Sequence, residues 1–424
     1  MAVAPRQQPL RSFVSSHADL NGRTTTLEDL RRVIRRIESR RPARPAPEPI
    51  ESLVGGDILD TGAGSLVVVR REFPLSHRHG RLALGDALAV AAPALELLAP
   101  LGAPSDPRRL LFLDTETTGL AGGTGTYAFL VGAAFVEDER FVLVQHFMRD
   151  FDEEPALLAA LNPLLDRASG IVTFNGSGFD LPLLETRFVL ARRHWPAALA
   201  HLDLLRPARR VWSAHFDDCR LPTLEREVLG LVREDDVPGY LIPALYFDFL
   251  RYRRAAPLTR VFEHNRDDVL SLAALLAWFA RALMAGADLA AAELAGVGRL
   301  WERCDPDRAA AYYERALDAG LAGDEGHRIR LCLARWEKRR ARWTEACALW
   351  QEASEARAFD VTPWEELAKY HEHRRRDFGA ALRIVRDALD LARAADAPAR
   401  ALEALCHRLA RLERRAQRAV TAPA

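Results

Sequence analysis

Two carboxylates at the end of an apolar run are the first candidates for chemistry. Residues 110–120 read LLFLDTETTGL, and Asp114 and Glu116 in this stretch are separated by one residue. Because side chains alternate along a strand, positions i and i+2 point to the same side. Two like charges held this close are unfavourable unless a cation lies between them. The pair therefore predicts a cation site, although an isolated Asp-x-Glu is more often a solvated strand end.

Two later stretches supply further candidate ligands. Residues 173–188 read TFNGSGFDLPLLETRF, a short buried strand and a glycine-containing turn that lead to Asp180, which we expect to open a helix. Residues 263–279 read EHNRDDVLSLAALLAWF, and we expect Asp268 at the N-terminal end of a buried helix. His264 precedes it by four residues and so shares its helix face. Taken singly, helix capping and the helix dipole would account for both aspartates.

The elements around these residues predict an α/β domain. The strand that ends at Asp114 is followed by two apolar runs, Tyr127–Val136 and Phe141–Phe147, with the charged turn EDER between them. A helix, the short strand and a second helix come next. This βββαβα order is typical of an α/β ribonuclease H-like mixed sheet with helices on both faces.

Composition and periodicity divide the chain into four predicted parts. They are residues 1–50, a helix after Thr26 and a Pro-rich linker; residues 51–107, an extension packed on the α/β domain; residues 108–287, the α/β domain; and residues 288–424, an all-α region. In the extension we expect a helix over Leu84–Leu98 and a surface loop that carries His77 and His79.

The all-α region contains segments that resemble one another. Aligning Ala316, Ala353 and Ala388 gives spacings of 37 and 35 residues. Helix pairs that repeat near 34 residues, with small residues where the helices cross, are typical of tetratricopeptide-like repeats.

Composition restricts the class of protein. The chain has 424 residues, 49% of them hydrophobic and 28% charged, and we find neither a signal peptide nor a membrane-spanning tract. Five scattered cysteines without a C-x-x-C pair argue against zinc and suit a reducing cytoplasm. We therefore expect a soluble, cytoplasmic protein.

The net charge is formally zero, so no global field would attract nucleic acid. A polynucleotide would have to be bound by metal and by local basic side chains, almost all of which are arginines. The candidates for phosphate contacts are Arg187, Arg192, Arg193, Arg206, Arg209 and Arg210.

The three stretches together resemble a known superfamily. FLDTETTGL, FNGSGFDLPLL and HNRDDVLSL are similar to the three exonuclease motifs of the DnaQ-like (DEDD) superfamily, and the chain more narrowly resembles the YprB-type ribonuclease H-like proteins, which carry tetratricopeptide repeats behind the nuclease domain. The resemblance implies that Asp114, Glu116, Asp180 and Asp268 are metal ligands. Their hard oxygen atoms suit Mg²⁺ or Mn²⁺, and two ions are expected.

His264 departs from both patterns of the superfamily, which uses a Tyr four residues before the last Asp or a His five residues before it. Here a His stands at the Tyr position. The resemblance implies that His264 orients or deprotonates the attacking water. A residue that only supports a metal ligand is the alternative.

Further residues are expected near the reaction centre. Small residues in the turn at 122–126 would let backbone N–H groups approach a terminal nucleotide. We expect substrate contacts from Thr117, Gly123, Thr124, Asn175 and Phe179. Asp203 is expected either to orient a metal ligand or to form a structural hydrogen bond. Residues 219–230 are expected to form a helix with a packing role.

The function that follows is a metal-dependent 3′–5′ exonuclease acting on nucleic acid at a single-stranded 3′ end, with helical repeats that dock a partner protein or the substrate. One alternative is a structure-specific endonuclease that uses the same site. Another is a nucleic-acid-binding scaffold that does not cut and works through its repeats. The sequence does not separate DNA from RNA.

Overall fold

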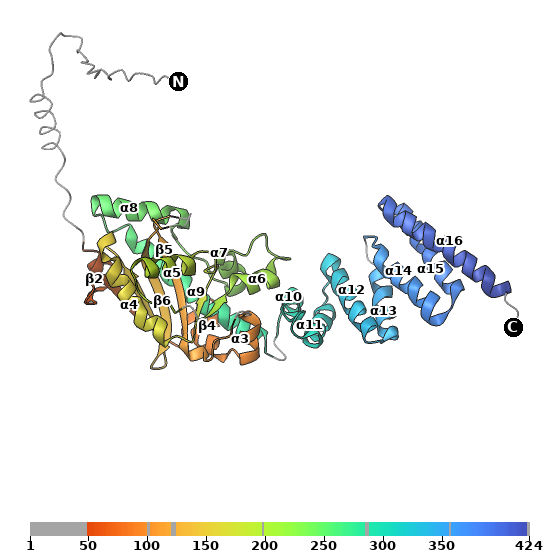
Figure 1. Ribbon diagram of the computed structural model, residues 1–424, viewed down its shortest axis with the longest axis horizontal. Helices are drawn as coiled ribbons and strands as arrows, with labels where there is room; N and C mark the ends of the chain where they lie inside the picture. The colour runs from red at the N-terminus through yellow and green to blue at the C-terminus, as the bar shows by residue number, and fades with distance from the viewer. Residues whose placement is uncertain are drawn as a thin grey trace, which may run out of the picture.

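The computed structural model describes residues 49–99, 102–119, 124–196, 199–284, 288–355 and 358–421. The predicted helix after Thr26 and the Pro-rich linker lie outside this set. In the described part of the chain, no helix is long and apolar enough to cross a membrane. Figure 1 shows an α/β part built around one sheet and a file of helices that extends from one end of it.

A seven-stranded sheet forms the centre of the α/β part (Figure 1). Its spatial order is β1-β2-β7-β6-β5-β8-β9; β5, β8 and β9 are parallel, and the other neighbouring pairs are antiparallel. The strands are β1 (Asp57–Asp60), β2 (Ser65–Pro74), β5 (Leu110–Thr117), β6 (Ala128–Glu137), β7 (Arg140–Phe147), β8 (Gly170–Thr173) and β9 (Ala200–Asp203). The predicted mixed sheet is confirmed, and the N-terminal extension contributes β1 and β2 to it. A separate ribbon pairs β3 (Arg78–His79) with β4 (Leu82–Ala83).

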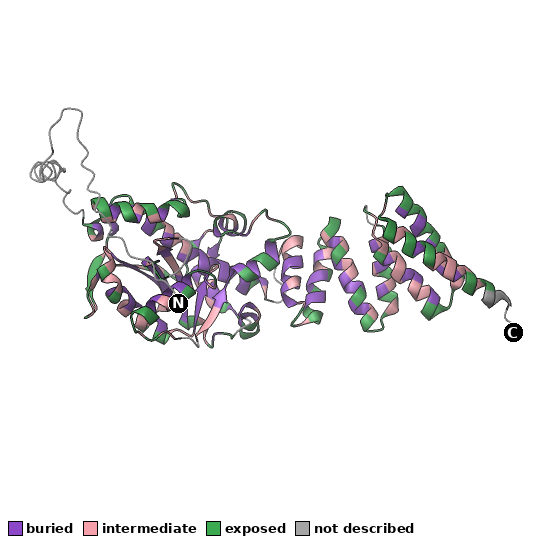
Figure 2. Cartoon of the chain, turned by 45° about the horizontal axis from the view of Figure 1, so that its top comes forward, coloured by how far each residue is buried: buried purple, intermediate pink, exposed green. Residues whose placement is uncertain are grey.

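Apolar clusters cover both faces of the sheet, as expected for strands that carry few polar residues. Along β5, Phe112 belongs to one buried cluster, and Leu111 and Leu113 belong to the other. The first cluster includes η1 (Leu84–Ala89), α3 (Ala92–Leu98) and α6 (Leu205–Trp212). The second includes α4 (Glu154–Arg167), α5 (Asp180–Leu190) and α8 (Ile242–Tyr252). Figure 2 shows the buried residues concentrated between these helices and the sheet.

Helix α9 (Leu258–Ala282) joins the two clusters. Its first turns, with Val261 and Phe262, belong to the second cluster, and the residues from Val269 onward belong to the first. The sequence-based prediction that Asp268 stands at the start of this helix is wrong, because the helix begins at Leu258. The macrodipole acts within the first turn, so it does not account for an aspartate in mid-helix.

The single helix predicted over Leu84–Leu98 is also wrong. The structure has a 3₁₀ turn, η1, and a separate helix, α3, with extended backbone between them. Pro93 lies in the first turn of α3. A proline inside a continuous helix would clash with the carbonyl four residues earlier, so the chain breaks before it.

Seven helices form the C-terminal part. They are α10 (Ala291–Trp301), α11 (Pro306–Asp318), α12 (Gly323–Arg339), α13 (Trp343–Ser354), α14 (Val361–Tyr370), α15 (Phe378–Ala394) and α16 (Ala399–Thr421). Consecutive helices pack as hairpins, and the aligned residues Ala316, Ala353 and Ala388 are buried on α11, α13 and α15. Their burial explains the spacing in the sequence, since each lies on the second helix of a pair.

The C-terminal helices attach to the α/β part through α10 and α6. Gly296 on α10 lies so close to α6 that a Cβ atom there would come within 2.5 Å of the carbonyl oxygen of Val211. The Arg299 guanidinium donates hydrogen bonds to the carbonyl oxygens of Arg210, at 2.7 Å, and Val211, at 2.8 Å. Close packing and two hydrogen bonds thus fix the direction in which the helices leave the sheet.

Candidate functional site

The carboxylates predicted from the sequence lie together at one end of β5. Asp114 and Glu116 stand near the end of the strand, and Asp180 is the first residue of α5. These three side chains line one hollow of about 480 Å³. Asp268 faces them from α9, near enough that its charge raises the pKa values of Asp114 and Glu116. Side chains separated by up to 154 positions in the sequence are therefore neighbours.

Burial and mutual repulsion dominate the electrostatics of this group. Burial is the largest cause that raises the pKa of Asp114 and of Glu116 well above the usual range, and the charge of Asp268 adds to it. Burial also raises the pKa of Asp180 to about 6, although Thr115 Oγ1 donates a 2.5 Å hydrogen bond to its carboxylate. The negative charges are therefore poorly compensated by the protein, and a cation among them would be favoured.

A buried amide pair holds Asp114 in place. Asn265 Nδ2 donates to Asp114 Oδ2 at 2.9 Å, and Gln145 Nε2 donates to Asn265 Oδ1 at 2.9 Å. Gly132 lies between Asp114 and Gln145 in the sheet register, and a Cβ atom there would come within 2.3 Å of Asn265 Oδ1. The glycine thus makes room for the asparagine. We assigned no role to Asn265 from the sequence, although a polar residue in a buried helix was a visible signal.

Arg233 is the second residue that sequence reasoning missed. Its guanidinium donates hydrogen bonds to the carboxylates of Asp268 and Glu225 and lies 3.4 Å from Asp236. The side chain of Arg233 is 8% exposed and that of Glu225 is 1% exposed. The sequence predicted only a packing role for the segment of α7 (Leu221–Leu224) and the π-turn that follows it. The structure adds a second role, because Glu225 anchors the cation that contacts Asp268.

The same network reaches the N-terminal extension. Ser271 Oγ donates to Glu225 at 2.5 Å, and His79 Nε2 lies 2.8 Å from Ser271 Oγ. His79 is buried, so the surface loop predicted for it is wrong. Burial lowers the pKa of His79 to about 4, which leaves the imidazole neutral at pH 7. A continuous polar chain therefore runs from the β3–β4 ribbon to Asp268.

His264 is held with one nitrogen facing the carboxylates. Its Nδ1 lies 2.8 Å from Asp236 Oδ1, and its Nε2 lies 3.9 Å from Glu116 Oε1 and 3.6 Å from Asp268 Oδ2. The predicted juxtaposition of His264 and Asp268 is confirmed. Burial alone would lower the pKa of His264, but the carboxylates of Asp236 and Asp268 outweigh it and raise the pKa above its usual value.

Asp203 holds the turn between β8 and α5. Its carboxylate accepts hydrogen bonds from the backbone N–H of Asn175, at 2.7 Å, and of Ser177, at 3.1 Å. Asn175 has a positive φ of 66°, which is uncommon outside glycine and needs such support. Of the two roles expected for Asp203, the structure shows the structural hydrogen bonds.

The predicted substrate residues are only partly brought together. Thr117, Asn175 and Phe179 line the hollow beside the carboxylates, and the Phe179 side chain is 56% exposed. Thr124 does not line it, and its carbonyl oxygen instead accepts a hydrogen bond from Arg187. Gly123 lies outside the described residues.

The prediction that Arg187 contacts phosphate is wrong. Its side chain is buried in a salt bridge with Glu154, and its guanidinium lies 3.9 Å from the centre of the Tyr127 ring. The other arginines proposed for that role do not line the hollow; they are Arg192, Arg193, Arg206, Arg209 and Arg210. Apart from Asp268's partner Arg233, the cations near the site therefore have structural roles or lie outside the hollow.

The donor set fits a divalent metal ion in its chemistry. Buried carboxylate oxygens are the ligands that Mg²⁺ and Mn²⁺ prefer, and a cation among them would offset the burial and repulsion that raise the pKa values of Asp114 and Glu116. Among the described residues, no three His, Cys, Asp or Glu side chains already converge closely enough to hold a metal. The carboxylates would have to move together around an ion.

Comparison with known proteins assigns the family. The family model described as the RNase_H superfamily matches residues 111–280, which contain all four carboxylates. A protein of Bacillus subtilis (strain 168), described as uncharacterized protein YprB, is 34% identical over 354 residues, which are 81% of this chain and 84% of the relative. The chain belongs to the YprB family. The match of this family member extends over most of the chain, beyond the part that the RNase_H superfamily model covers.

Replacing Asp114 with Asn is expected to stabilise the metal-free protein at pH 8. Because the pKa of Asp114 is raised in the folded state, folding becomes less favourable as the pH rises above the ordinary value of 3.8. The amide removes this loss, so the variant should have a higher free energy of unfolding than the parent. Urea unfolding in chelator measures it.

The gain should vanish below about pH 3, well under the ordinary pKa of 3.8, where Asp114 is protonated in the folded and unfolded states. Asp248→Asn, at an exposed position on α8, is the matched control and should change the free energy of unfolding little. An Asp114→Asn protein less stable than the parent at pH 8 would contradict the charge repulsion described above.

Replacing Arg233 with Met should destabilise the protein by about 3–5 kcal/mol, because it leaves the buried carboxylate of Glu225 unpaired. Adding Glu225→Gln to the same chain should recover at least half of this loss, since the charge is then removed as well. Arg226→Met, which breaks the exposed pair with Glu227, is the control and should change stability by less than about 1 kcal/mol. No recovery in the double variant would mean that Glu225 is not the anchor.

Proposed function

We propose that this YprB-family chain is a divalent-metal-dependent nuclease that hydrolyses phosphodiester bonds, acting as a 3′–5′ exonuclease of the DnaQ-like (DEDD) type. The observation that carries the proposal is the group of four carboxylates at the end of β5, in which burial and the charge of Asp268 raise the pKa values of Asp114 and Glu116, in a domain of the RNase_H superfamily. Asp114, Glu116, Asp180 and Asp268 would hold the metal. Two bound ions would activate the attacking water and stabilise the leaving 3′ oxygen.

The protein's own groups have separate tasks in this proposal. Asn265 orients Asp114 through the hydrogen bond to Oδ2. Arg233 binds one oxygen of Asp268, which leaves the other oxygen facing His264. His264 takes the proton of the attacking water on Nε2, while Asp236 holds the ring through Nδ1. The water oxygen bonds to phosphorus as the P–O3′ bond breaks, which releases a nucleoside 5′-monophosphate. The leaving O3′ takes a proton from solvent water, so the strand ends in a 3′ hydroxyl.

The size and lining of the hollow suit the binding of one nucleotide at the end of a nucleic acid strand. Its volume of about 480 Å³ lies within the range of small-ligand sites, and Phe179 offers an exposed aromatic face on which a base would stack. Thr117 and Asn175 line the hollow beside the carboxylates and would contact the sugar or the phosphate. DNA and RNA are both substrates to be tested.

The helical hairpins behind this domain are proposed to be tetratricopeptide-like repeats that dock the substrate or a partner protein. Their buried alanines at matching positions and their pairwise packing support this assignment. We propose that the protein works in the cytoplasm, which suits five thiols that form no disulfide in the described structure.

Single-stranded DNA and RNA, labelled at the 3′ or the 5′ end, should be shortened stepwise from the 3′ end when Mg²⁺ or Mn²⁺ is present. Chelator should stop the reaction, and Asp114→Asn should lower the rate by at least about 10³-fold because a metal ligand is lost. Asp248→Asn serves as the control that keeps full activity. Gel analysis of the labelled products gives both the rate and the polarity.

Each other outcome of this assay rejects part of the proposal. Internal cuts on these or on structured substrates would replace the exonuclease with an endonuclease at the same site. Absence of cleavage with every substrate would leave a nucleic-acid-binding scaffold. Equal cleavage by the parent and by Asp114→Asn would show that the carboxylate group is not the active site.

Replacing His264 with Ala should lower kcat by about 10²–10⁴-fold, the usual contribution of a general base, with little change in KM. The acidic limb of the pH–rate profile should disappear with it. His215→Ala, which alters a histidine remote from the hollow, should retain the parent profile. If the His264→Ala enzyme had a normal kcat and an unchanged pH–rate profile, His264 would not be the general base and its role would be limited to supporting the metal ligands.

A further inference from the structure

Two adjoining hollows lie on the C-terminal helices, away from the carboxylates. The first, of about 450 Å³, is lined mainly by α12, α13 and α14. The second, of about 290 Å³, is lined by α12, α13, α14, α16 and the turn after α14. Both are lined by the ion pair of Lys338 and Glu366, so the two hollows adjoin there and are described together as one groove. Its basic lining residues, which define the basic groove, are Arg328, Arg335, Lys338, Lys369, Arg374, Arg408 and Arg411.

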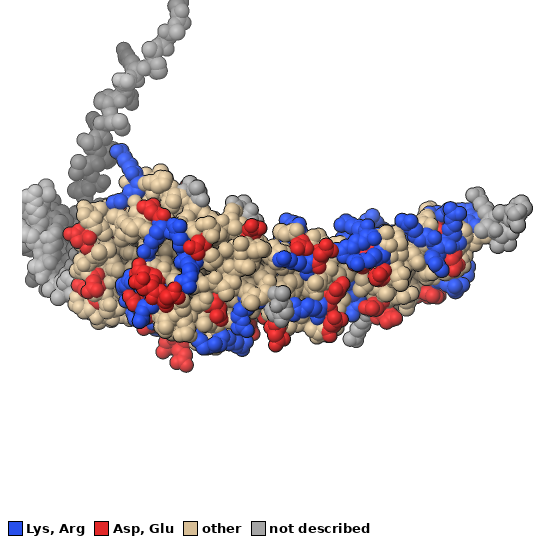
Figure 3. All heavy atoms as spheres, turned by 90° about the horizontal axis from the view of Figure 1, so that it is seen from below, with Lys and Arg blue, Asp and Glu red and all other residues tan. Residues whose placement is uncertain are grey.

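The basic groove concentrates positive charge in a chain whose net charge is zero. Seven basic residues line it against two acidic residues, Glu302 and Glu366. Three more acidic residues, Glu325, Glu365 and Glu372, pair with these cations from outside the lining. The cations still exceed the carboxylates by two. Lys338 and Lys369 are also the only lysines in the sequence. Figure 3 shows that Lys and Arg side chains form several groups along the C-terminal helices on the face it presents.

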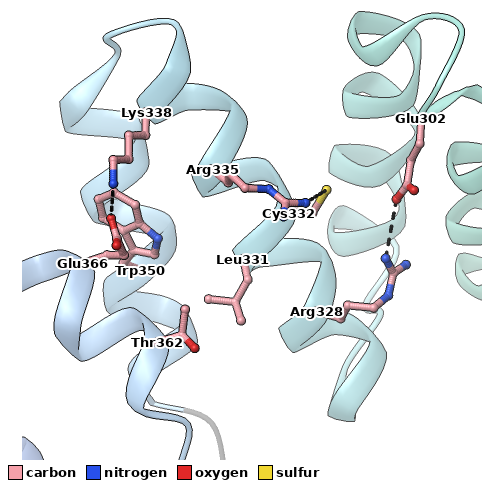
Figure 4. Close-up of a pocket in the computed structure, with 9 residues that line it drawn as sticks. All are labelled: Glu302, Arg328, Leu331, Cys332, Arg335, Lys338, Trp350, Thr362 and Glu366. Atoms are coloured by element: carbon pink, nitrogen blue, oxygen red, sulfur yellow. Dashed lines mark hydrogen bonds and ion pairs between the residues drawn. The ribbon is translucent and has the colours of Figure 1, made fainter. Parts of the chain in front are cut away.

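Two of the seven cations have no carboxylate partner among the described residues. Arg335 contacts the thiol of Cys332 at 3.7 Å, and the Arg374 guanidinium lies 4.6 Å from the centre of the Trp343 ring. Both arginines are exposed. The other five are ion-paired, as Arg328 is with Glu302 and Lys338 with Glu366 (Figure 4). The groove thus has an uncompensated positive charge at two points, one in each hollow.

The arrangement suits an elongated anion. Figure 4 shows Arg328, Arg335 and Lys338 extending from α12 at successive positions along one hollow. The second hollow continues through Arg374 to Arg408 on α16. The ligand must therefore carry negative charges along its length, and α10 fixes the groove relative to the α/β part through its contacts with α6.

Two of the three Trp and Tyr rings that line the groove face cations, and the third, Tyr370, stacks on Trp343. The Lys338 ammonium lies 5.9 Å from the centre of the Trp350 ring, which is 3% exposed, and Arg374 covers Trp343. Stacking of bases or insertion of apolar peptide side chains would first have to displace these cations. Contact through regularly spaced phosphates needs no such change, because it involves the cations alone.

We propose that the basic groove binds the phosphodiester backbone of single-stranded DNA or RNA, so that a strand engages the protein beyond the active site. The nature of the polymer rests on the proposed nuclease function. Phosphate contacts position a strand without reading its sequence. Binding in the groove is therefore independent of base composition and weakens steeply with salt.

The test is fluorescence anisotropy of labelled single strands of about 30 nucleotides, longer than the ~4–16 nucleotides that one binding module covers. The full chain carries Asp114→Asn and is kept in chelator, so that cleavage does not interfere. On this background, Arg335→Glu with Arg374→Glu reverses the two cations that lack carboxylate partners. Arg339→Glu with Arg383→Glu makes the same charge change at exposed positions outside the groove.

The groove variant should bind DNA and RNA at least about tenfold more weakly than the control variant. The slope of log K against log salt should fall by about 1.4, which is two contacts at about 0.7 each for single strands. Circular dichroism of both variants should match the parent. Because cleavage is disabled throughout, this result is independent of whether the carboxylate group is a nuclease site.

Equal affinity and equal salt slope for the groove and control variants would overturn the proposal. It would also be overturned if the parent failed to bind either labelled strand but bound a labelled poly-glutamate peptide that the groove variant did not bind. In that case the groove would serve an acidic protein partner.

Discussion

The concentration of four carboxylates at the end of one strand is the constraint on which the rest of the structure depends. Burial raises the pKa values of Asp114, Glu116 and Asp180, and repulsion from neighbouring carboxylates adds to it at Asp114 and Glu116, so this arrangement opposes folding in the absence of a counter-ion. Surrounding elements must therefore hold the side chains in place against their own charge. Such local strain is expected at functional sites and is offset by packing elsewhere.

The supports come from elements that are distant in the sequence. Gly132 on β6 opens the space in which Asn265 reaches Asp114, and Gln145 on β7 holds that asparagine. On the other side, Arg233 contacts Asp268 and is anchored by Glu225, which connects through Ser271 to His79 in the N-terminal extension. The extension thus belongs to the site's support as well as to the sheet. It adds two strands beyond β7 and closes the polar network behind Asp268.

The features that could be predicted from sequence were those with local patterns. Alternation on β5 predicted the common side of Asp114 and Glu116, and the turn before α5 predicted Asp180 at its start. The long-range ion pair of Arg233 has no such pattern, since its partners lie 8 and 35 positions away. The same is true of Arg187, whose burial depends on the packing of α5 against α4. The sequence analysis placed Asp268 at a helix start because polar residues precede it. In the structure α9 continues through these polar residues, since apolar residues before them, such as Val261 and Phe262, are also packed in the core.

Manganese binding tests the central claim, that the carboxylate group is a metal site, most directly. Crystals of the full chain soaked in Mn²⁺ would be measured for anomalous scattering, beside crystals of Asp114→Asn. The account predicts anomalous density among Asp114, Glu116 and Asp268 in the parent and its loss in the variant. Density confined to other places, or none at all with an ordered carboxylate group, would contradict it.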